Sequence, residues 1–282
     1  MPEPLISNIS DTARWVAVYR AWESARPDAL FNDPFAERLA GERGKAIAAV
    51  VPRQARSGWP MVVRTKWIDD LTLASVKEGC DCVVNLAAGL DTRPYRLALP
   101  AWLRWVEADL PGMIDEKEKL LAGEKAVCRL SREKVDLSDA DARGAFLDRV
   151  LEGASKALVI TEGLLGYLDE EVVRRLSQDL LSRPAVRWWM IDPASPAIMQ
   201  MMQKGMGEHL TSSPLKFAPP NGVTFYEDLG WKAQDICDIF RGAIQFRRLP
   251  WFLRLLGIFP QPDPRNPGKG RWSAVVRLGR PT

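Results

Sequence analysis

The chain has 282 residues, of which 46% are hydrophobic and 27% charged, with a formal net charge of +3 and a single histidine, His209. One histidine excludes a metal centre with several histidine ligands, and a Ser-His-Asp triad would have to be built on that imidazole. The length suits one large domain or a domain with an appended subdomain. We therefore expect any catalysis to proceed without a metal and without a histidine base.

The first part of the chain, 1–78, is predicted to form an N-terminal helical cap. Ser10 or Asp11 is a suitable N-cap for the helix that follows, and Asp33-Pro34 is a suitable entry to the next one. A further helix, MVVRTKWIDDLTLASVKEG, ends at Gly79. The start of the chain lacks the basic and apolar regions of a signal peptide, and no run approaches the roughly 18 apolar residues of a membrane span. We expect a cytoplasmic protein.

Cysteine usage agrees with a reducing compartment. The chain contains no C-x-x-C motif, and its one C-x-C pair, Cys80 and Cys82, flanks a β-branched run. Because alternate positions of a strand share one face, the pair is predicted to be two buried free thiols on the same face.

Strands and helices alternate from residue 79 to the end. Beyond the strand CDCVVNLA (80–87), strands are predicted at 103–109, 126–136, 157–162 and 186–192, and helices at 112–122, 139–152 and 169–182. This pattern predicts an α/β fold with a doubly wound, mostly parallel, Rossmann-like sheet over 79–282. Ligands of such sheets bind beyond the carboxyl ends of the strands, here just after Ala87, Glu107, Val135, Thr161 and Ile191.

The segment 193–225 is predicted to be irregular and to form a lid insertion. His209 lies in it as a surface or capping residue, with contact to a polar substrate as the alternative. Its methionines either adapt to an apolar ligand or pack the inner face of the lid; they are Met199, Met201, Met202 and Met206. A helix at 226–240 and a closing strand at 272–278 complete the pattern.

The last 42 residues are strongly basic, since 241–282 hold nine Lys and Arg residues against one acid, Asp263, a local charge of +8. Within them, 245–262 (QFRRLPWFLRLLGIFPQP) allows three interpretations. In order of preference, it is an amphipathic element packed on the sheet, a docking face for an acidic or carrier-bound substrate, or a membrane-surface segment. Nucleic-acid binding is not expected, because no recognition motif accompanies the basic patch.

The most informative stretch is VVNLAAGLDTRPYRL (83–97), a strand that runs into a turn containing Gly89. Asp109 follows Gly89 by 20 residues, the spacing at which a carboxylate accepts hydrogen bonds from ribose hydroxyls. The G-x-G-x-x-G set that cradles a pyrophosphate is missing, so a nucleoside cofactor without phosphates, S-adenosylmethionine, fits better. Neither a dehydrogenase Tyr-x-x-x-Lys pair nor a hydrolase G-x-S-x-G motif is present.

In these motifs the chain resembles the leucine carboxyl methyltransferase-like family of class I S-adenosylmethionine-dependent methyltransferases. Within that family it resembles the bacterial polyketide-type O-methyltransferase branch. The matching blocks occur in family order between about 10 and 195. They are SDTARWVAVYRAWESARPDALFNDPFA (10–36), VRTKWIDD (63–70), VVNLAAGLDTRPYRL (83–97), WVEADLP (105–111), VDLSD (135–139) and TEGLLGYLDEE (161–171).

The resemblance implies which residues hold the cofactor. Arg64 would bind the methionine carboxylate, Gly89 would lie beneath the cofactor, and Asp109 would accept the ribose hydroxyls. Asp136 and Leu137 would flank the adenine, and Glu162 would lie near the methionine end. The sequence departs from the family at Ala87, where glycine is usual. Asp91 and Arg93 either cap the following helix and pair with an acid, respectively, or take part in the site.

The implied activity is methylation of an oxygen atom on a small molecule, such as a polyketide-type metabolite that is apolar or carrier-bound. A carboxylate acceptor is favoured over a hydroxyl because it is already ionised and needs no base. For a hydroxyl, Glu162, Tyr167 and Asp11 are the candidates for positioning or deprotonating it. The alternatives are a non-catalytic binding or scaffold protein with this fold, and a methyltransferase for protein C-terminal carboxylates. The oligomeric state stays open.

Overall fold

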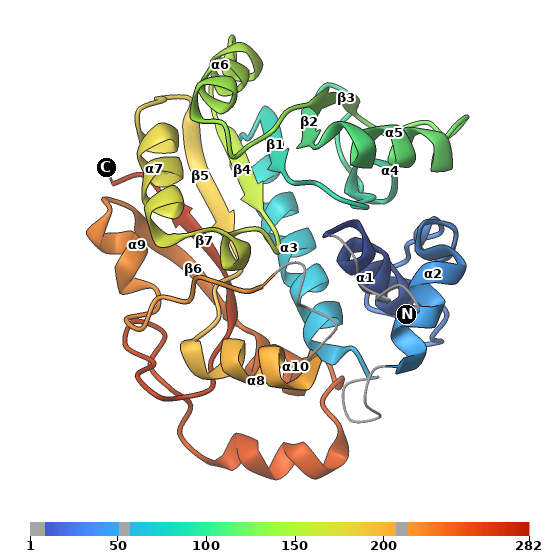
Figure 1. Ribbon diagram of the computed structural model, residues 1–282, viewed down its shortest axis with the longest axis vertical. Coiled ribbons are helices and arrows are strands. Elements are labelled where there is room, and N and C mark those ends of the chain that lie inside the picture. The colour runs from blue at the N-terminus through green and yellow to red at the C-terminus, as the bar shows by residue number, and fades with distance from the viewer. Residues whose placement is uncertain (1–8, 51–56, 207–213, 282) are drawn as a thin grey trace, which may run out of the picture.

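The computed structural model describes residues 9–50, 57–206 and 214–281 (Figure 1). Within these ranges, seven strands form one sheet in the order β3-β2-β1-β4-β5-β7-β6. Strands β1 to β5 are parallel, and β7 runs antiparallel to both of its neighbours. The strands are β1 (Cys82–Leu86), β2 (Arg104–Asp109), β3 (Arg129–Lys134), β4 (Ala157–Thr161), β5 (Val186–Ile191), β6 (Lys232–Asp238) and β7 (Ala274–Gly279). The predicted doubly wound, mostly parallel sheet is confirmed.

Helices cover both faces of this sheet and one of its edges. The α-helices are α1 (Ile9–Ser24), α2 (Ala36–Val50), α3 (Trp59–Lys77), α4 (Arg93–Arg96), α5 (Pro111–Leu120), α6 (Ala140–Leu151), α7 (Glu170–Leu181), α8 (Pro196–Met206), α9 (Thr224–Asp228) and α10 (Ile239–Gln245). The described residues also form the 3₁₀ helices η1 (Leu165–Tyr167) and η3 (Trp251–Ile258).

The two faces of the sheet contribute to two hydrophobic clusters. On one face, Val84 and Leu86 of β1 share a cluster with residues of α6 and α7, such as Phe146 and Leu176. On the other face, Val83 belongs to a cluster that includes Ile68 of α3. Because both faces are covered, β1 and β4 are buried at every position, which explains why their sequences, CVVNL and ALVIT, are mostly apolar.

The helices predicted in residues 10–78 are present as α1, α2 and α3. Figure 1 shows α1 and α2 side by side, with α3 passing through the centre of the view. A third cluster joins Val18 of α1 and Leu39 of α2 to Leu90, which follows β1, and to Met113 of α5. The α1–α2 pair therefore lies over the chain that leaves β1.

The helix predicted at 226–240 is wrong. The chain forms the short helix α9, then the edge strand β6, and only then α10. Strand β6 pairs with β7 alone, and its side chains are exposed or half-buried. An edge strand of this kind lacks the apolar run that marks the central strands, so its sequence, KAQDICD, gives a weak strand signal.

Two other predictions need correction. The segment expected to be irregular contains α8, which begins at Pro196, a residue compatible with the first turn of a helix. His209 lies outside the described residues, as do 207–213 in general. All four cysteines are free, as predicted, but Cys80 and Cys82 do not share a face: Cys80 clusters with Val83, whereas Cys82 clusters with Val84. Strand β1 begins only at Cys82, so strand alternation does not extend to Cys80.

The basic C-terminal stretch packs on the core only in its first part, through Phe246, Leu249 and Leu253, so the preferred interpretation of an element packed on the sheet is confirmed for that part alone. Leu253 of η3 contacts the core, whereas the neighbouring apolar side chains of η3 are largely exposed. Figure 1 shows η3 as the orange-red helix at the lower end of the molecule, below α8 and α10. No helix among the described residues combines the length and apolarity needed to cross a membrane.

The turn after β1 has an unusual backbone. Ala87 adopts φ 54°, a left-handed conformation that glycine tolerates and alanine does not favour, and Gly89 adopts φ 47°. A left-handed alanine costs about 1–2 kcal/mol. The residue that departs from the family pattern is thus held in a strained conformation by its surroundings.

We expect Ala87→Gly to raise the free energy of unfolding by about 0.5–1 kcal/mol, because relief of the strain exceeds the added flexibility of the unfolded chain. Urea unfolding measures this change. Ala88→Gly is the matched control: Ala88 is buried and does not have a positive φ, so its loss should destabilise by about 0.5–1 kcal/mol. Equal destabilisation by both variants would contradict the strain at Ala87.

Candidate functional site

The carboxyl ends of β1 and β2 meet in one hydrogen-bonded unit. The backbone N–H of Gly89 donates to Asp109 Oδ2 at 2.7 Å, and the N–H of Leu110 donates to Asp109 Oδ1 at 2.8 Å. Burial raises the pKa of Asp109, and these two donors oppose the rise. The structure therefore brings together the two residues that the 20-residue spacing had linked. Glu107, two residues earlier, is fully buried and pairs with Lys117 and Arg132 below the strand end.

A second unit joins α3 to the ends of β4 and β5. Arg64 Nη2 lies 3.1 Å from Glu162 Oε1, and Arg64 Nη1 donates to Asp192 Oδ2 at 2.8 Å. Asp192 also accepts from the N–H of Gly163 at 3.0 Å. Asp192 was not among the predicted site residues. Only its position in the sequence could have indicated a role, because it is the first residue after β5, at the edge of the sheet where ligands of such folds bind.

Arg93 connects these units. Its guanidinium, 2% exposed, contacts three carboxylates: Asp69 on α3 at 2.7 Å, Asp91 at 3.0 Å and Glu162 at 2.7 Å. Asp91 also accepts from the backbone N–H of Arg93 at the start of α4. Asp91 and Arg93 therefore have the capping and pairing roles considered from the sequence, and through Glu162 they also support the site.

The network continues beneath α1. Arg96 donates to Asp69 at 2.6 Å, and Arg20 of α1 donates to Asp33 at 2.8 Å. Asp33 also accepts from the hydroxyl of Thr92 at 2.7 Å. The helices that cover the site are thus joined to the loop after β1 by buried polar contacts.

The two acids of the Arg64 unit differ in their ion pairs, because Glu162 is shared by Arg64 and Arg93 whereas Asp192 pairs with Arg64 alone. Burial raises the pKa of Asp192 to about 6; Glu162 adds to the rise, and Arg64 opposes it. Burial would also raise the pKa of Glu162, but Arg93 and Arg64 together bring it below its usual value. The pKa values of the two acids therefore differ: Glu162 stays ionised at neutral pH, whereas Asp192 titrates near pH 6.

One donor of this unit is left over. Arg64 Nε is buried and has no hydrogen-bond partner among the described residues. A buried donor without a partner is costly, and a carboxylate or water placed beside it would satisfy it. Arg64 Nε can therefore donate a hydrogen bond to an additional anionic group while Arg64 keeps its contacts to Glu162 and Asp192.

The remaining predicted residues lie in different surroundings. Asp136 and Leu137 follow β3 close to Asp109, whose carbonyl accepts from the N–H of Val135. Asp136 is exposed, and its hydrogen bonds from Ser138 lower its pKa. Leu137 packs against the core cluster that includes Leu86.

Two of the candidate bases, Tyr167 and Asp11, also lie in different surroundings. Burial raises the pKa of Tyr167, with the Thr12 hydroxyl and Arg64 acting against the rise. Asp11 is buried and forms a two-point ion pair with Arg43 of α2, so its carboxylate joins α1 to α2. Neither residue is set up to accept a proton at neutral pH.

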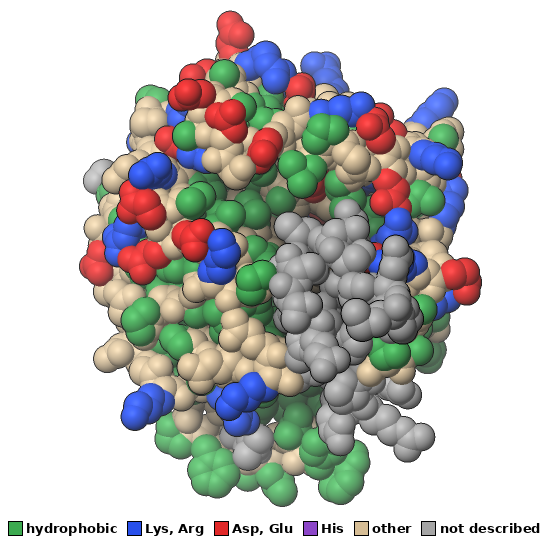
Figure 2. Space-filling view, in the orientation of Figure 1, with side chains coloured by type: hydrophobic (Ala, Val, Ile, Leu, Met, Phe, Trp, Pro, Cys, Tyr) green, Lys and Arg blue, Asp and Glu red, His purple; other side chains and the backbone are tan. Residues whose placement is uncertain are grey.

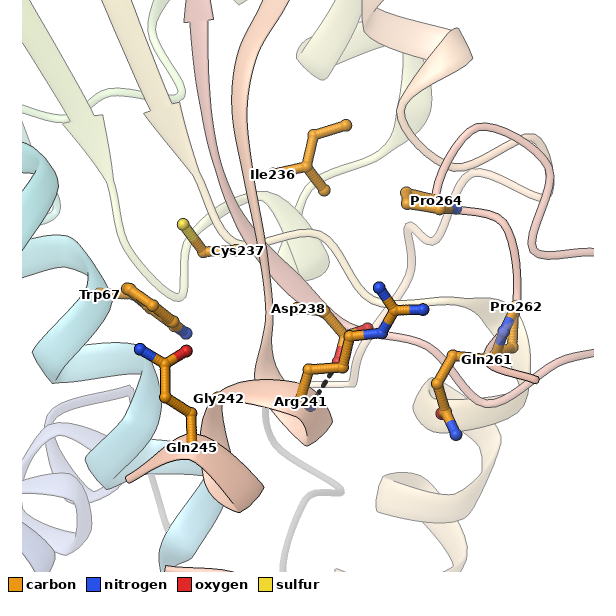
Figure 3. A pocket seen from close by; sticks show the side chains of 10 residues that line it. All are labelled: Trp67, Ile236, Cys237, Asp238, Arg241, Gly242, Gln245, Gln261, Pro262 and Pro264. Atoms are coloured by element: carbon orange, nitrogen blue, oxygen red, sulfur yellow. Dashed lines mark hydrogen bonds between the residues drawn. The ribbon is translucent and has the colours of Figure 1, made fainter. Parts of the chain in front are cut away.

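Two cavities lie away from these residues. One, of about 300 Å³, opens at the carboxyl end of β6 and is lined by Trp67, Cys237, Arg241 and Gln261 among others (Figure 3). Figure 3 shows the Trp67 indole facing the side chain of Gln245.

The second cavity, of about 270 Å³, is lined by Tyr19, Trp22, Trp59 and Arg247 among others. Trp15, in contrast, is buried and donates to the Tyr19 hydroxyl. None of the predicted cofactor residues lines either cavity.

Comparison with known proteins identifies the family. The family model described as leucine carboxyl methyltransferase matches residues 13–180. The chain belongs to this family. Its match spans α1 to α7 and includes Arg64, the turn at Gly89, Asp109 and Glu162. The protein is accordingly a methyltransferase.

Relatives of this methyltransferase extend the match toward the C-terminus. A protein of Parafrankia sp. (strain EAN1pec) named "Putative S-adenosyl-L-methionine-dependent methyltransferase" is 32% identical over 274 residues, which cover 90% of this chain and 86% of that protein. A protein of Frankia alni with the same descriptive name is 35% identical over 233 residues, covering 75% of this chain and 81% of that protein.

Solved structures agree on the fold. A DUF574 family protein from Streptomyces avermitilis superposes with a TM-score of 0.60 at 13% identity, over 96% of this chain and 97% of that chain. A protein from Thermobifida fusca described as a putative methyltransferase superposes with a TM-score of 0.56 at 14% identity, over 94% and 95% of the two chains. The methyltransferase fold is thus shared over nearly the whole length.

We expect Asp69→Ala to lower the free energy of unfolding by about 3–5 kcal/mol, because it removes a buried partner from both Arg93 and Arg96. Chemical denaturation measures the loss. Glu170→Ala is the control, since it removes an exposed i,i+4 pair with Arg174 and should cost about 0.5 kcal/mol or less. A similar small cost for both variants would show that the network does not hold the fold.

Asp192 predicts a pH-dependent stability. Its folded pKa of about 6 lies above that of an unfolded aspartate, so the native chain binds this proton more tightly. The resulting stabilisation is complete below about pH 4 and is lost as the pH rises through about 6. Relative to Asp192→Asn, the unfolding free energy of the wild type should fall by about 2 kcal/mol between about pH 4 and pH 7. Urea unfolding at a series of pH values tests this; a constant difference would refute it.

Proposed function

We propose that the protein is an S-adenosylmethionine-dependent O-methyltransferase that methylates a carboxylate of a small molecule. The observation that carries the acceptor class is that Glu162, Tyr167 and Asp11 are all unsuited to act as a base. Glu162 is held between two arginines, Tyr167 has a raised pKa, and Asp11 is paired with Arg43. A carboxylate needs no deprotonation at neutral pH, so it suits a site in which none of these three residues can act as a base.

The described residues fit the cofactor. S-adenosylmethionine supplies a methyl group already activated on a sulfonium, together with an ammonium, a carboxylate and a ribose. The unpartnered Nε of Arg64 suits the carboxylate, and the carboxylates of Glu162 and Asp192 suit the cationic groups.

The other contacts follow from the turn after β1. Asp109 would accept the ribose hydroxyls with lone pairs that its two backbone donors leave free. Gly89 would lie beneath the cofactor: a Cβ there would approach Ala13 of α1 at 3.4 Å, so the turn passes close under the covering helix. Asp136 and Leu137, beyond β3, would flank the adenine.

In the reaction, the chain's own residues chiefly align and shield the reactants. Arg64, Glu162 and Asp109 would hold the cofactor at three points across the ends of β1, β2 and β4. Helices α1 and α2 lie over the chain leaving β1 and would exclude water. The acceptor proposed for this arrangement is a small organic acid of the polyketide type.

A hydroxyl acceptor is a second candidate, favoured by one observation. Asp192, with a pKa raised to about 6, is the carboxylate of the site best able to accept a proton near neutral pH. Under this alternative, Asp192→Asn abolishes methylation of phenols and alcohols. Under the carboxylate proposal, the same variant retains methylation of acids, because no proton has to be removed.

The test uses the full-length protein with S-adenosylmethionine and matched acceptors: aliphatic and aromatic acids, the corresponding alcohols and phenols, and a peptide with a free C-terminus. We expect methyl esters of the small acids, detected as methanol released by base and as S-adenosylhomocysteine formed. Their rate should be nearly flat above about pH 7. Turnover of the phenols and alcohols alone would overturn the carboxylate assignment, and turnover of the peptide alone would overturn the small-molecule assignment.

The cofactor assignment has its own readout. Asp109→Ala should weaken S-adenosylhomocysteine binding at least about tenfold by calorimetry, since two charge-assisted hydrogen bonds are lost. Asp115→Ala is the control, because Asp115 also follows β2 but is exposed and pairs with Lys134. If the wild type does not bind at millimolar concentration, the protein is a non-catalytic member of the family.

A further inference from the structure

The apolar side of η3 has no covering partner in the described chain. We define the η3 patch as Trp251, Phe252, Leu255, Ile258 and Phe259, which are 80, 52, 68, 78 and 65% exposed. A 3₁₀ helix has three residues per turn, so residues three apart lie above one another. Phe252, Leu255 and Ile258 therefore form a continuous apolar ridge, with Trp251 and Phe259 at its ends.

The patch belongs to the ordered fold of the chain. Leu253 on another side of η3 joins the core cluster beneath α3 and α10, and its N–H donates to the carbonyl of Pro250. Gly257 lies against α10, since a Cβ there would meet Ile244 Cδ1 at 2.7 Å. Runs of 3₁₀ helix beyond three or four residues are uncommon. The eight-residue helix η3 packs one side on the core and leaves its other side exposed to solvent, which indicates a surface for contact with a partner.

The shape of this surface is convex. Figure 1 shows η3 as the lowest element of the molecule, and Figure 2 shows hydrophobic side chains gathered along that lower end. Neither of the two cavities described above is lined by any residue of the patch. A projecting ridge suits insertion into a soft interface better than capture of a partner's side chain in a pocket.

Most of the charges around the patch are basic, and one exposed acid, Asp263, follows Pro262. Arg254 lies within η3 and Arg247 lies just before it, and neither forms an ion pair with any residue that the structure describes. Lys269 and Arg271 are exposed on either side of Gly270, which packs against Pro262, three residues beyond the patch. They too have no ion-pair partner in the described ranges. In the view of Figure 2, basic side chains and no acidic ones border the hydrophobic lower end.

We propose that the η3 patch docks this protein on the surface of an anionic lipid bilayer. Tryptophan and phenylalanine partition to the membrane interface, leucine and isoleucine enter the acyl boundary, and the flanking arginines meet the anionic headgroups. The combination of a convex apolar ridge with unpaired cations fits this surface better than an acidic protein, for which a groove or flat face would be expected. The proposal does not depend on the acceptor that is methylated.

The experiment is sedimentation of the full-length protein, without cofactor, with vesicles of phosphatidylcholine alone or mixed with phosphatidylglycerol. We expect binding to the mixed vesicles at physiological ionic strength and weaker binding to phosphatidylcholine alone. Leu255→Ser/Ile258→Ser should lower the partition coefficient at least about tenfold. Arg247→Gln/Arg254→Gln should lower it several-fold on mixed vesicles only, because each cation contributes through headgroup charge.

Trp102→Ser is the matched control, because Trp102 is 52% exposed in the loop before β2 and outside the patch, so binding should not change. Unchanged unfolding midpoints and S-adenosylhomocysteine affinity would show that the patch variants stay folded. The proposal is overturned if the wild type does not bind mixed vesicles, or if the Ser variants bind as tightly. It is also overturned if the patch instead mediates a dimer, or binds a purified acyl-carrier protein, with no vesicle binding.

Discussion

The fold and its site depend on the buried guanidinium of Arg93. A buried charge is strongly unfavourable unless carboxylates surround it, and here they come from α3, from the loop after β1 and from the end of β4. These elements are distant in sequence, so the charge is compensated only when the sheet and α3 are in place. Because Asp69 shares α3 with Arg64, and Glu162 pairs with both arginines, the contacts that satisfy Arg93 also position the site.

The electrostatics of the site follow from this arrangement. Arg93 and Arg64 hold Glu162 as an anion, whereas burial raises the pKa of Asp192, with a smaller contribution from the charge of Glu162. Glu162 and Asp192 lie beside an arginine donor, Arg64 Nε, that has no hydrogen-bond partner among the described residues. This combination is suited to a ligand that carries both a cation and a carboxylate, which is the character of an amino-acid group. The strained turn at Ala87 lies at the same edge and keeps the backbone close to where such a ligand would extend.

Much of the fold was predictable because its signals are local. Central strands buried on both faces are mostly apolar, and the helices between them follow an ordinary amphipathic pattern, so the doubly wound sheet followed from the chain. The strand β6 was missed because an exposed edge strand carries polar residues at most positions. Gly89 and Asp109 were linked in advance because parallel strands end at one edge. Asp192 carries no motif of its own, and its role depends on Arg64 reaching it across 128 residues.

The sequence by itself determined the alternation of strands and helices through α7 and β5, the edge of the sheet where the candidate site is expected, and the family, because each of these depends on residue type and local spacing. Only the tertiary structure decided which acids share an arginine, that Tyr167 and Asp11 are unsuited as bases, and that η3 leaves its apolar ridge uncovered. Pairing, pKa and exposure are properties of the surroundings that the folded chain places around a residue, and local sequence does not specify those surroundings.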